Sequence, residues 1–198
     1  MTPRGHGSPV LFRITMTNTT STAAAKTVAN SRCTMTEIVL PNDTNGLGNL
    51  MGGRLLHLMD KAAAISTQRH ANRVCVTAAV DTVEFNSPIR QGEIIIIESQ
   101  VNRAFRSSME VELNVWAEDP QAQTRRKCNR AYYTFVAVDE NIQPTAVPPI
   151  QPETKLEMDR YESASKRREL RLVMSGRIEL RDATTLREDV LAVIRGGE

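Results

Sequence analysis

The hydrophobic pattern of this chain changes its period once, near residue 72, and that change restricts the fold more than any other feature. Between residues 50 and 69 (LMGGRLLHLMDKAAAISTQR) apolar side chains recur at helical spacing, which predicts one helix over about 53–69. After Asn72 the period falls to two, in four strand-like runs at 74–85, 93–101, 108–118 and 127–139. A shorter run at 34–40 (TMTEIVL), stopped by Pro41, predicts one strand ahead of the helix.

One strand, one helix and four antiparallel strands predict the α+β class, with a curved antiparallel β-sheet wrapped around one long central helix. The 108–118 run alternates, with Met109 and Val111 on one side and Glu110 and Glu112 on the other, so we expect one face to be buried and one to meet solvent. A single helix leaves an edge of such a sheet uncovered. We therefore expect at least a dimer, formed by edge pairing or by contact between helices.

The segments outside this central part differ from it in composition. Residues 1–33, rich in Thr, Ser and Ala, are expected to be a disordered N-terminal tail, and residues 34–140 the folded domain. Residues 141–152 (NIQPTAVPPIQP) are expected to be a Pro-rich linker. Residues 153–198 carry charged helical patterns, at 153–175 and 183–194, and are expected to form a C-terminal helical extension.

Composition argues against several functional classes. The formal net charge is only +2, so we expect no nucleic-acid partner, and no run of about 18 apolar residues predicts a membrane span. Because the N-terminus carries no clear secretion signal, we expect a cytoplasmic location. Cys33, Cys75 and Cys128 lack the spacing of a disulfide scaffold or a zinc site. We expect reduced structural thiols and no metal site, with a nucleophilic cysteine as the alternative.

A Gly/Asn-rich loop, NDTNGLGN at residues 42–49, leads into the predicted helix. It delivers Asn49 just before a first helical turn whose backbone N–H groups, near Gly52 and Gly53, have no partner within the helix and can bind a carbonyl oxygen or an oxyanion. Asp60 follows Gly53 by two helical turns and so lies on the same face. Apolar neighbours would partly desolvate its carboxylate and make it a base or a nucleophile. The alternative is an exposed helix acid paired with a lysine or arginine.

Several motifs follow one another in a characteristic order. The first is N-x-x-G-N-x-x-G-G-x-x-L-x-x-M-D at residues 45–60, and R-H follows at 69–70. VTAAVD at 76–81, F-x-x-P-I-x-x-G-E at 85–93 and SSMEVELNV at 107–115 complete the set. Together they resemble the acyl-CoA thioesterases of the hot-dog superfamily, the group of the brain-type cytosolic acyl-CoA hydrolases and their single-domain bacterial relatives. The tail at 147–168 resembles the C-terminal helix of the two-domain relatives.

This resemblance implies a hot-dog fold and an enzyme that hydrolyses fatty acyl-CoA to a free fatty acid and CoA. In that family a helix aspartate and a loop asparagine act together across a dimer interface. By resemblance, Asp60 would be the general base or nucleophile, and Asn49 of the neighbouring protomer would orient the water or the thioester. The resemblance also implies a trimer of dimers. CoA is part of the substrate, so no separate cofactor is expected.

Arg103, Arg106, Ser107 and Ser108 lie between two predicted strands, where related proteins receive the nucleotide and pantetheine of CoA. Arginines suit its phosphates, and exposed backbone groups suit the pantetheine amides; a solvated turn is the alternative. Two histidines are expected to have other roles. His57 is expected to pack or to lie at an interface, and His70 to favour the negative end of the helix dipole.

Three other functions fit parts of the pattern. Hot-dog domains also serve as non-enzymatic acyl-CoA sensors that control transcription, but residues 1–33 are too short and too polar to supply a DNA-binding helix-turn-helix. A binding or scaffold role for the Arg-rich stretch at 166–181 is a weaker form of this alternative. Hot-dog dehydratases use a histidine placed differently relative to an acid.

Overall fold

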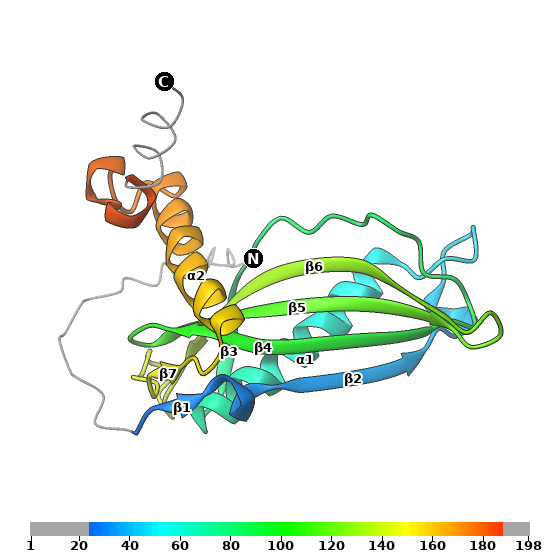
Figure 1. The fold of residues 1–198 in the computed structure, drawn as a ribbon, viewed down its shortest axis with the longest axis horizontal. Helices are drawn as coiled ribbons and strands as arrows, with labels where there is room; N and C mark the ends of the chain where they lie inside the picture. The colour runs from blue at the N-terminus through cyan, green and yellow to red at the C-terminus, as the bar shows by residue number, and fades with distance from the viewer. Residues whose placement is uncertain (1–23, 188–198) are drawn as a thin grey trace, which may run out of the picture.

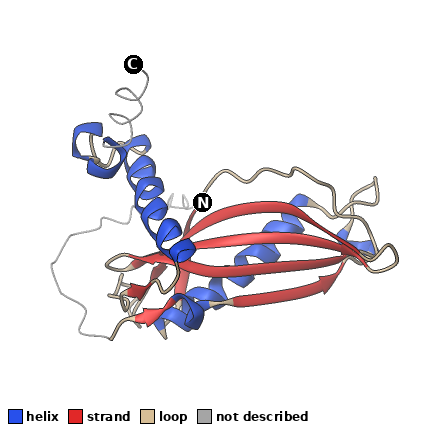
Figure 2. Ribbon diagram, viewed as in Figure 1, coloured by secondary structure: helices blue, strands red, loops and turns tan. Residues whose placement is uncertain are grey.

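The computed structural model describes residues 24–187, and a five-stranded antiparallel sheet forms its centre (Figure 1). In spatial order the strands are β2 (Cys33–Ile38), β4 (Ile94–Ala104), β5 (Ser108–Asp119), β6 (Thr124–Ala137) and β3 (Cys75–Val80). One helix, α1 (Gly52–Ala71), lies on one face of the sheet, and α2 (Lys155–Met174) lies on the other face (Figure 2). This is the hot-dog arrangement that the strand, helix, four-strand order predicts.

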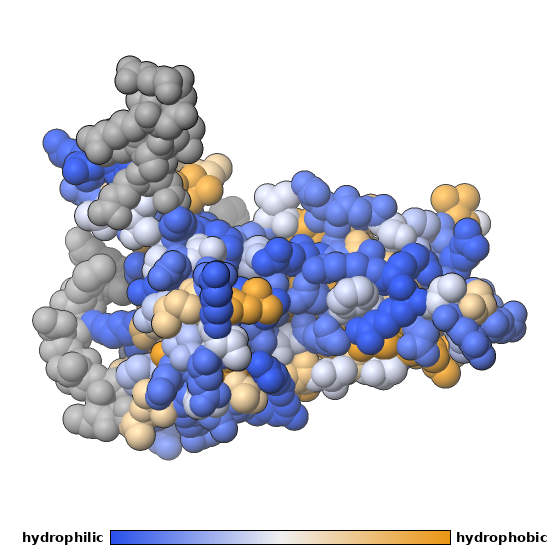
Figure 3. Space-filling view, viewed as in Figure 1, coloured by the Kyte–Doolittle hydropathy of each residue, from blue (hydrophilic) through white to orange (hydrophobic). Residues whose placement is uncertain are grey.

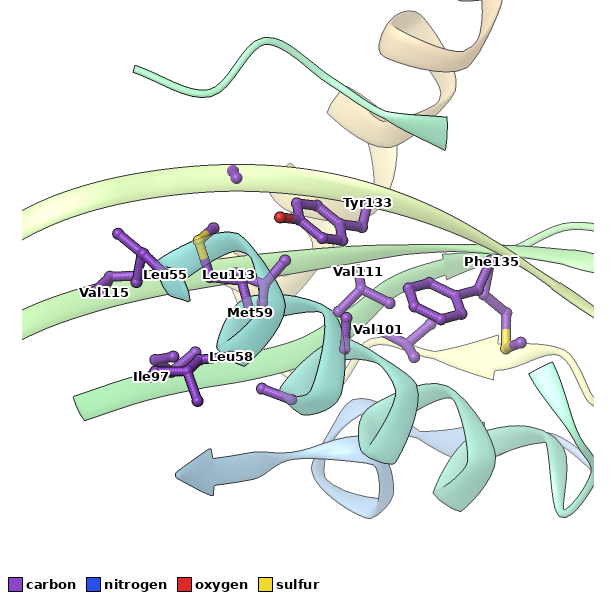
Figure 4. Close-up of a cluster of buried hydrophobic side chains, with 14 of the residues drawn as sticks. Leu55, Leu58, Met59, Ile97, Val101, Val111, Leu113, Val115, Tyr133 and Phe135 are labelled. Atoms are coloured by element: carbon purple, nitrogen blue, oxygen red, sulfur yellow. The ribbon is translucent and has the colours of Figure 1, made fainter. Parts of the chain in front are cut away.

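Helix α1 packs on the inner face of the sheet because its apolar residues recur every three or four positions. Leu55, Leu58 and Met59 are buried, and Ala62 and Ala63 are fully buried where the helix approaches the strands most closely. The inner residues of β4, β5 and β6 face them, as Figure 4 shows. The helix ends at Ala71, and the next residue, Asn72, caps it in the left-handed region with φ of 52°. The predicted helix is confirmed, with one more residue at its start and two more at its end.

The outer face of the sheet is not simply exposed, which corrects the expectation for β5. Glu110 and Glu112 point away from α1, as the alternation predicts, but they are 0% and 1% exposed. Helix α2 covers them, and its arginines pair with them: Arg167 lies 2.7 Å from Glu110, and Arg160 lies 3.0 Å from Glu112. Buried carboxylates need such partners because an unpaired buried charge is strongly unfavourable. The surrounding surface is mostly hydrophilic (Figure 3).

Two predicted boundaries are also corrected. The 26–33 part of the expected N-terminal tail is ordered: β1 (Lys26–Thr27) leads into the 3-10 helix η1 (Val28–Ser31), and β2 already begins at Cys33. The expected linker contains β7 (Ile150–Gln151), which pairs with β1 in parallel. Both segments are ordered because Val28, Val147 and Ile150 bury their side chains in the core. Residues 1–23 of the expected tail and 188–198 of the extension lie outside the described part of the chain.

Two further 3-10 helices complete the described elements: η2 (Pro41–Asp43) precedes α1, and η3 (Leu180–Asp182) follows α2. The first helical segment expected in the C-terminal extension is α2, and the second is described only up to residue 187. Between residues 24 and 187, neither long helix combines the length and the apolar character that a membrane crossing requires.

His70 lies at the end of α1 but does not act as a cation on the helix dipole. Its ring is fully buried; Nε2 lies 2.8 Å from the carbonyl oxygen of Pro148, while Nδ1 has no hydrogen-bond partner among the described residues. Burial lowers the pKa of His70, the charge of Lys26 lowers it further, and the bond to Pro148 opposes both. Lys26 instead neutralises the helix end, because its Nζ donates to the carbonyl oxygens of Arg69 and His70.

We therefore expect acid to destabilise the fold through His70. A folded-state pKa below the ordinary value of 6.5 means that the unfolded chain takes up this proton first. The stabilising contribution of the neutral ring is complete above that value and is lost as the pH falls toward the lowered folded-state pKa. Thermal unfolding measured from pH 7.5 to 5.5 should show a falling midpoint, and His70→Gln should reduce this slope. The control is His57→Gln, at an exposed position on the same helix, and an equal loss of slope in both variants would contradict the assignment.

Candidate functional site

The loop at residues 44–50 is closed by its own asparagines. Asn45 Oδ1 accepts hydrogen bonds from the backbone N–H groups of Leu47, at 2.9 Å, and Asn49, at 3.2 Å. The backbone N–H of Asn45 donates in turn to the carbonyl oxygen of Asn49 at 2.8 Å. Gly48, with φ of 72°, supplies the left-handed residue that this tight turn requires. Asn49 is half-buried, while Asn45 is exposed.

Backbone bonds fix this loop to the segment just before β4. Leu50 N–H donates to the carbonyl oxygen of Ile89 at 2.7 Å, and Gln91 N–H donates to that of Gly48 at 3.0 Å. Asn49 itself forms an isolated antiparallel bridge with Arg90. The loop therefore presents Asn49 at a defined place, at the end of the sheet where β4 begins.

The first turn of α1 begins directly after this loop. Its N–H groups near Gly52 and Gly53 precede the first intrahelical bonds, as the sequence predicts. A Cβ on Gly52 would lie 3.3 Å from the ring of Phe85, so glycine permits a close approach there; a Cβ on Gly53 would meet nothing within 4 Å. The proposed oxyanion role of these two glycines stays a prediction.

Asp60 is half-buried on the side of α1 that faces β3. The hydroxyl of Thr77, on β3, donates to its Oδ1 at 2.6 Å, a short charge-assisted bond that fixes the carboxylate. The sequence pattern alone does not single out Thr77. The available signal was a hydroxyl residue within the VTAAVD motif, but only the strand register shows which element it faces.

The strand register shows which candidates share an end of the sheet. Thr77 is paired with Phe135, Phe135 with Met109, and Met109 with Ala104. Thr77 is thus in register with the last residue of β4, next to the β4–β5 turn that contains Arg106 and Ser107. The 44–50 loop lies before the first turn of α1, beside the segment that leads into the other end of β4. About 10 Å of helix also separates Asp60 from Gly53. One chain therefore does not bring Asn49 and Asp60 to one point.

The four predicted CoA-binding residues lie together at this turn. Arg103, the last but one residue of β4, is engaged by α2: its guanidinium stacks on the ring of Tyr161 at 3.9 Å and donates to the Tyr161 carbonyl oxygen at 3.2 Å. Arg106 is exposed, and Ser107 and Ser108 are half-buried. The binding role of all four stays a prediction.

The cysteines fit the structural interpretation. Cys33, Cys75 and Cys128 are free and buried. Burial raises the pKa of the Cys75 thiol, against a weaker opposing effect of Thr67, and it also raises the pKa of Cys128. A raised thiol pKa disfavours a nucleophilic thiolate. Within residues 24–187, no three His, Cys, Asp or Glu side chains are grouped as metal ligands.

Comparison with known proteins identifies the family to which this chain belongs. A thioesterase superfamily model matches residues 47–123. The acyl-CoA thioester hydrolase YkhA of Bacillus subtilis, itself uncharacterized, is 39% identical over 69% of this chain and 80% of its own length. A solved apo-hexameric acyl-CoA thioesterase is 37% identical, with a TM-score of 0.74 over 80% of this chain and 99% of its own.

A third relative has been solved with ligands. The acyl-CoA hydrolase of Staphylococcus aureus, in complex with butyryl-CoA, CoA and CoA disulfide, is 33% identical, with a TM-score of 0.71 over 85% of this chain and 99% of its own. The resemblance found in the loop–helix unit is thus confirmed across most of the chain. The protein belongs to the acyl-CoA thioester hydrolase family of the thioesterase superfamily.

Proposed function

We propose that this protein hydrolyses fatty acyl-CoA thioesters to a free fatty acid and CoA, with Asp60 as the reacting carboxylate. The observation that carries the proposal is the 2.6 Å bond from Thr77 to Asp60, in a chain whose relatives are named acyl-CoA hydrolases. The bond holds one carboxylate oxygen in place and leaves the other for chemistry.

Variants of the Staphylococcus aureus relative support a role for Asp60 and Thr77 and draw attention to Asn45. Alanine variants of an aspartate, a threonine and an asparagine have been solved. The threonine there follows the aspartate by 17 positions, which is also the separation of Asp60 and Thr77. The asparagine precedes the aspartate by 15 positions, and that spacing leads to Asn45 rather than to Asn49.

We assign different roles to the two asparagines. Asn49 is half-buried just before the helix start, and we propose that its amide orients the water or the thioester. Asn45 holds Asn49 in place, because its Oδ1 accepts the Asn49 N–H at 3.2 Å. Both residues would then be needed, one at the substrate and one through the loop.

The chemistry needs only these groups and water. Asp60 accepts a proton from water as the water oxygen bonds to the thioester carbonyl carbon, and the carbonyl electron pair moves onto its oxygen. The N–H groups near Gly52 and Gly53 stabilise that oxygen's charge. When the pair returns, the carbon–sulfur bond breaks, and the thiolate takes up the proton held by Asp60. CoA enters as part of the substrate, and Arg103 and Arg106 are proposed to attract its phosphates.

The proposed site also requires a homo-oligomer of at least two chains. By analogy with the hexameric relatives, we propose a trimer of dimers. Exposed apolar side chains lie on and beside the edge strand β3, which carries Thr77: Val74, Val76 and Val80, with Phe85 following beside Gly52. A second copy would cover them and bring its Asn49 loop to this Asp60. Two relatives are described as hexameric, and a rat relative, 35% identical, as cytosolic. We place this enzyme in the cytoplasm by that analogy.

Thiol release from acyl-CoA substrates of short, medium and long chain tests the activity. We expect hydrolysis above the buffer rate, and Asp60→Asn should lower kcat about 100- to 10,000-fold because a general base is lost. Thr77→Val should cost about 10- to 100-fold, because the carboxylate loses a charge-assisted bond. Asp159→Asn, an exposed acid of α2, serves as the control and should match wild type. Tight binding of acyl-CoA without turnover at any length would favour the acyl-CoA sensor instead.

A second experiment distinguishes the proposed role of Asn49 at the substrate from that of Asn45 in the loop. Asn49→Ala and Asn45→Ala should both lose most activity. Asn45→Asp keeps the acceptor oxygen for the two backbone N–H groups, so it should retain most of the activity if Asn45 acts only through the loop. An inactive but folded Asn45→Asp enzyme, beside an active Asn49→Ala, would transfer the substrate-contacting role to Asn45.

Complementation tests the sharing of the site between protomers. Asn49→Ala and Asp60→Asn oligomers should each be nearly inactive, since each lacks one partner at every site. In a mixed dimer, one of the two sites pairs wild-type Asn49 with wild-type Asp60. Random exchange at equal amounts makes about half of the dimers mixed, so about a quarter of wild-type activity should return. No recovery after verified exchange would place both residues in one protomer's site.

A further inference from the structure

Tyr133 carries a hydroxyl group that the fold does not use. Its side chain is 1% exposed, and Oη is buried without a hydrogen-bond partner among the described residues. Figure 4 shows the ring between β6 and α1, beside Met59. A buried hydroxyl without a partner loses its hydrogen bonds to water and gains none in return, which is unfavourable. Phenylalanine would fill the same space without this cost, as Phe135 does two residues later on the same face of β6.

Tyr133 lies two residues from Phe135, the residue of β6 that pairs with Thr77. Tyr133 is paired across the sheet with Val80 of β3, on the strand that carries Thr77, and with Val111 of β5. Burial and the negative charge of Asp60 raise the pKa of Tyr133 to about 12. The phenol therefore keeps its proton at any working pH and acts as a hydrogen-bond donor next to a carboxylate.

The neighbouring tyrosine shows what a structural role looks like in this protein. Tyr132 points to the outer face, where its ring stacks on the guanidinium of Arg167 at 3.7 Å and of Arg130 at 5.2 Å. Its position is explained by these contacts. Nothing comparable explains the hydroxyl of Tyr133, and an unsatisfied buried donor beside a charged group is the kind of local conflict that proteins keep where function needs it.

We propose that Tyr133 is a further catalytic residue, whose hydroxyl donates a hydrogen bond to the attacking water. This inference rests on the proposed hydrolase function. The water gives one proton to Asp60 as general base and accepts the hydroxyl of Tyr133 on one lone pair. Its second lone pair then forms the bond to the thioester carbonyl carbon, while the carbonyl π pair moves to oxygen. Tyr133 keeps its proton throughout, so its effect is to fix the direction of attack.

Tyr133→Phe tests the role, with Tyr132→Phe as the matched control, because each removes one hydroxyl from adjacent positions on opposite faces of β6. In Tyr133→Phe we expect kcat to fall about 10- to 100-fold at nearly constant KM, because the lost bond acts in the transition state. Its unfolding midpoint should stay unchanged or rise by up to about 4 °C, because an unpaired buried hydroxyl is removed. Tyr132→Phe should keep the wild-type kcat.

The possible outcomes distinguish a failure of the Tyr133 role from a failure of the proposed hydrolase function. Wild-type activity in Tyr133→Phe, with an active wild-type enzyme and an impaired Asp60→Asn, would overturn the role of Tyr133 and leave the hydrolase intact. A fall in both kcat and the unfolding midpoint would show that the hydroxyl has a structural partner, which also overturns the proposal. A wild-type enzyme inactive on every acyl-CoA would overturn the proposed function, and the role of Tyr133 with it.

Discussion

The close packing of α1 against the inner face of the sheet is the interaction on which the rest of the structure depends. Ala62 and Ala63, both fully buried, let the helix backbone approach β4 and β5, while Leu58 and Met59 fill the space beside them. This packing fixes the rotation of the helix. Asp60, the residue after Met59, then comes to the flank that faces β3, where Thr77 reaches it. The position of the acid follows from the packing of its neighbours.

The outer face is stabilised by a different interaction. Glu110 and Glu112 project from β5 into a surface that α2 covers, and the arginines of α2 enclose them, with Arg167 reaching both oxygens of Glu110. Replacing one partner would leave a buried charge, so these pairs fix where α2 sits on the sheet more than they add stability. Because Arg103 stacks on Tyr161 of the same helix, the position of α2 also fixes one side of the β4–β5 turn.

The periodicity of the sequence predicted the helix, the strands and their order, because hydrophobic spacing records which face is buried. It did not predict that a helix covers the outer face. The alternation of Glu110 with Val111 is the same whether that face is exposed to solvent or covered by a helix. For a related reason, the sequence did not point to Thr77 or Tyr133. Their positions relative to Asp60 depend on the pairing of β3 with β6, where a register shift lies between Thr77 and Ala79. Period alone cannot give that register. Asp60 and the asparagine loop could be proposed from the sequence because their motif lies within one continuous stretch.

The geometry of the single chain explains why a second copy belongs in the proposed site. The loop that presents Asn49 is bonded to the segment before β4, whereas Thr77, which bonds to Asp60, is in register with the far end of that strand. Neither can move without breaking the sheet or unpacking α1. An antiparallel partner, applied along the apolar edge of β3, reverses the direction of the strands and so brings the loop end of one chain toward the acid end of the other. The rigidity that separates the two groups within a chain would then hold them together between chains.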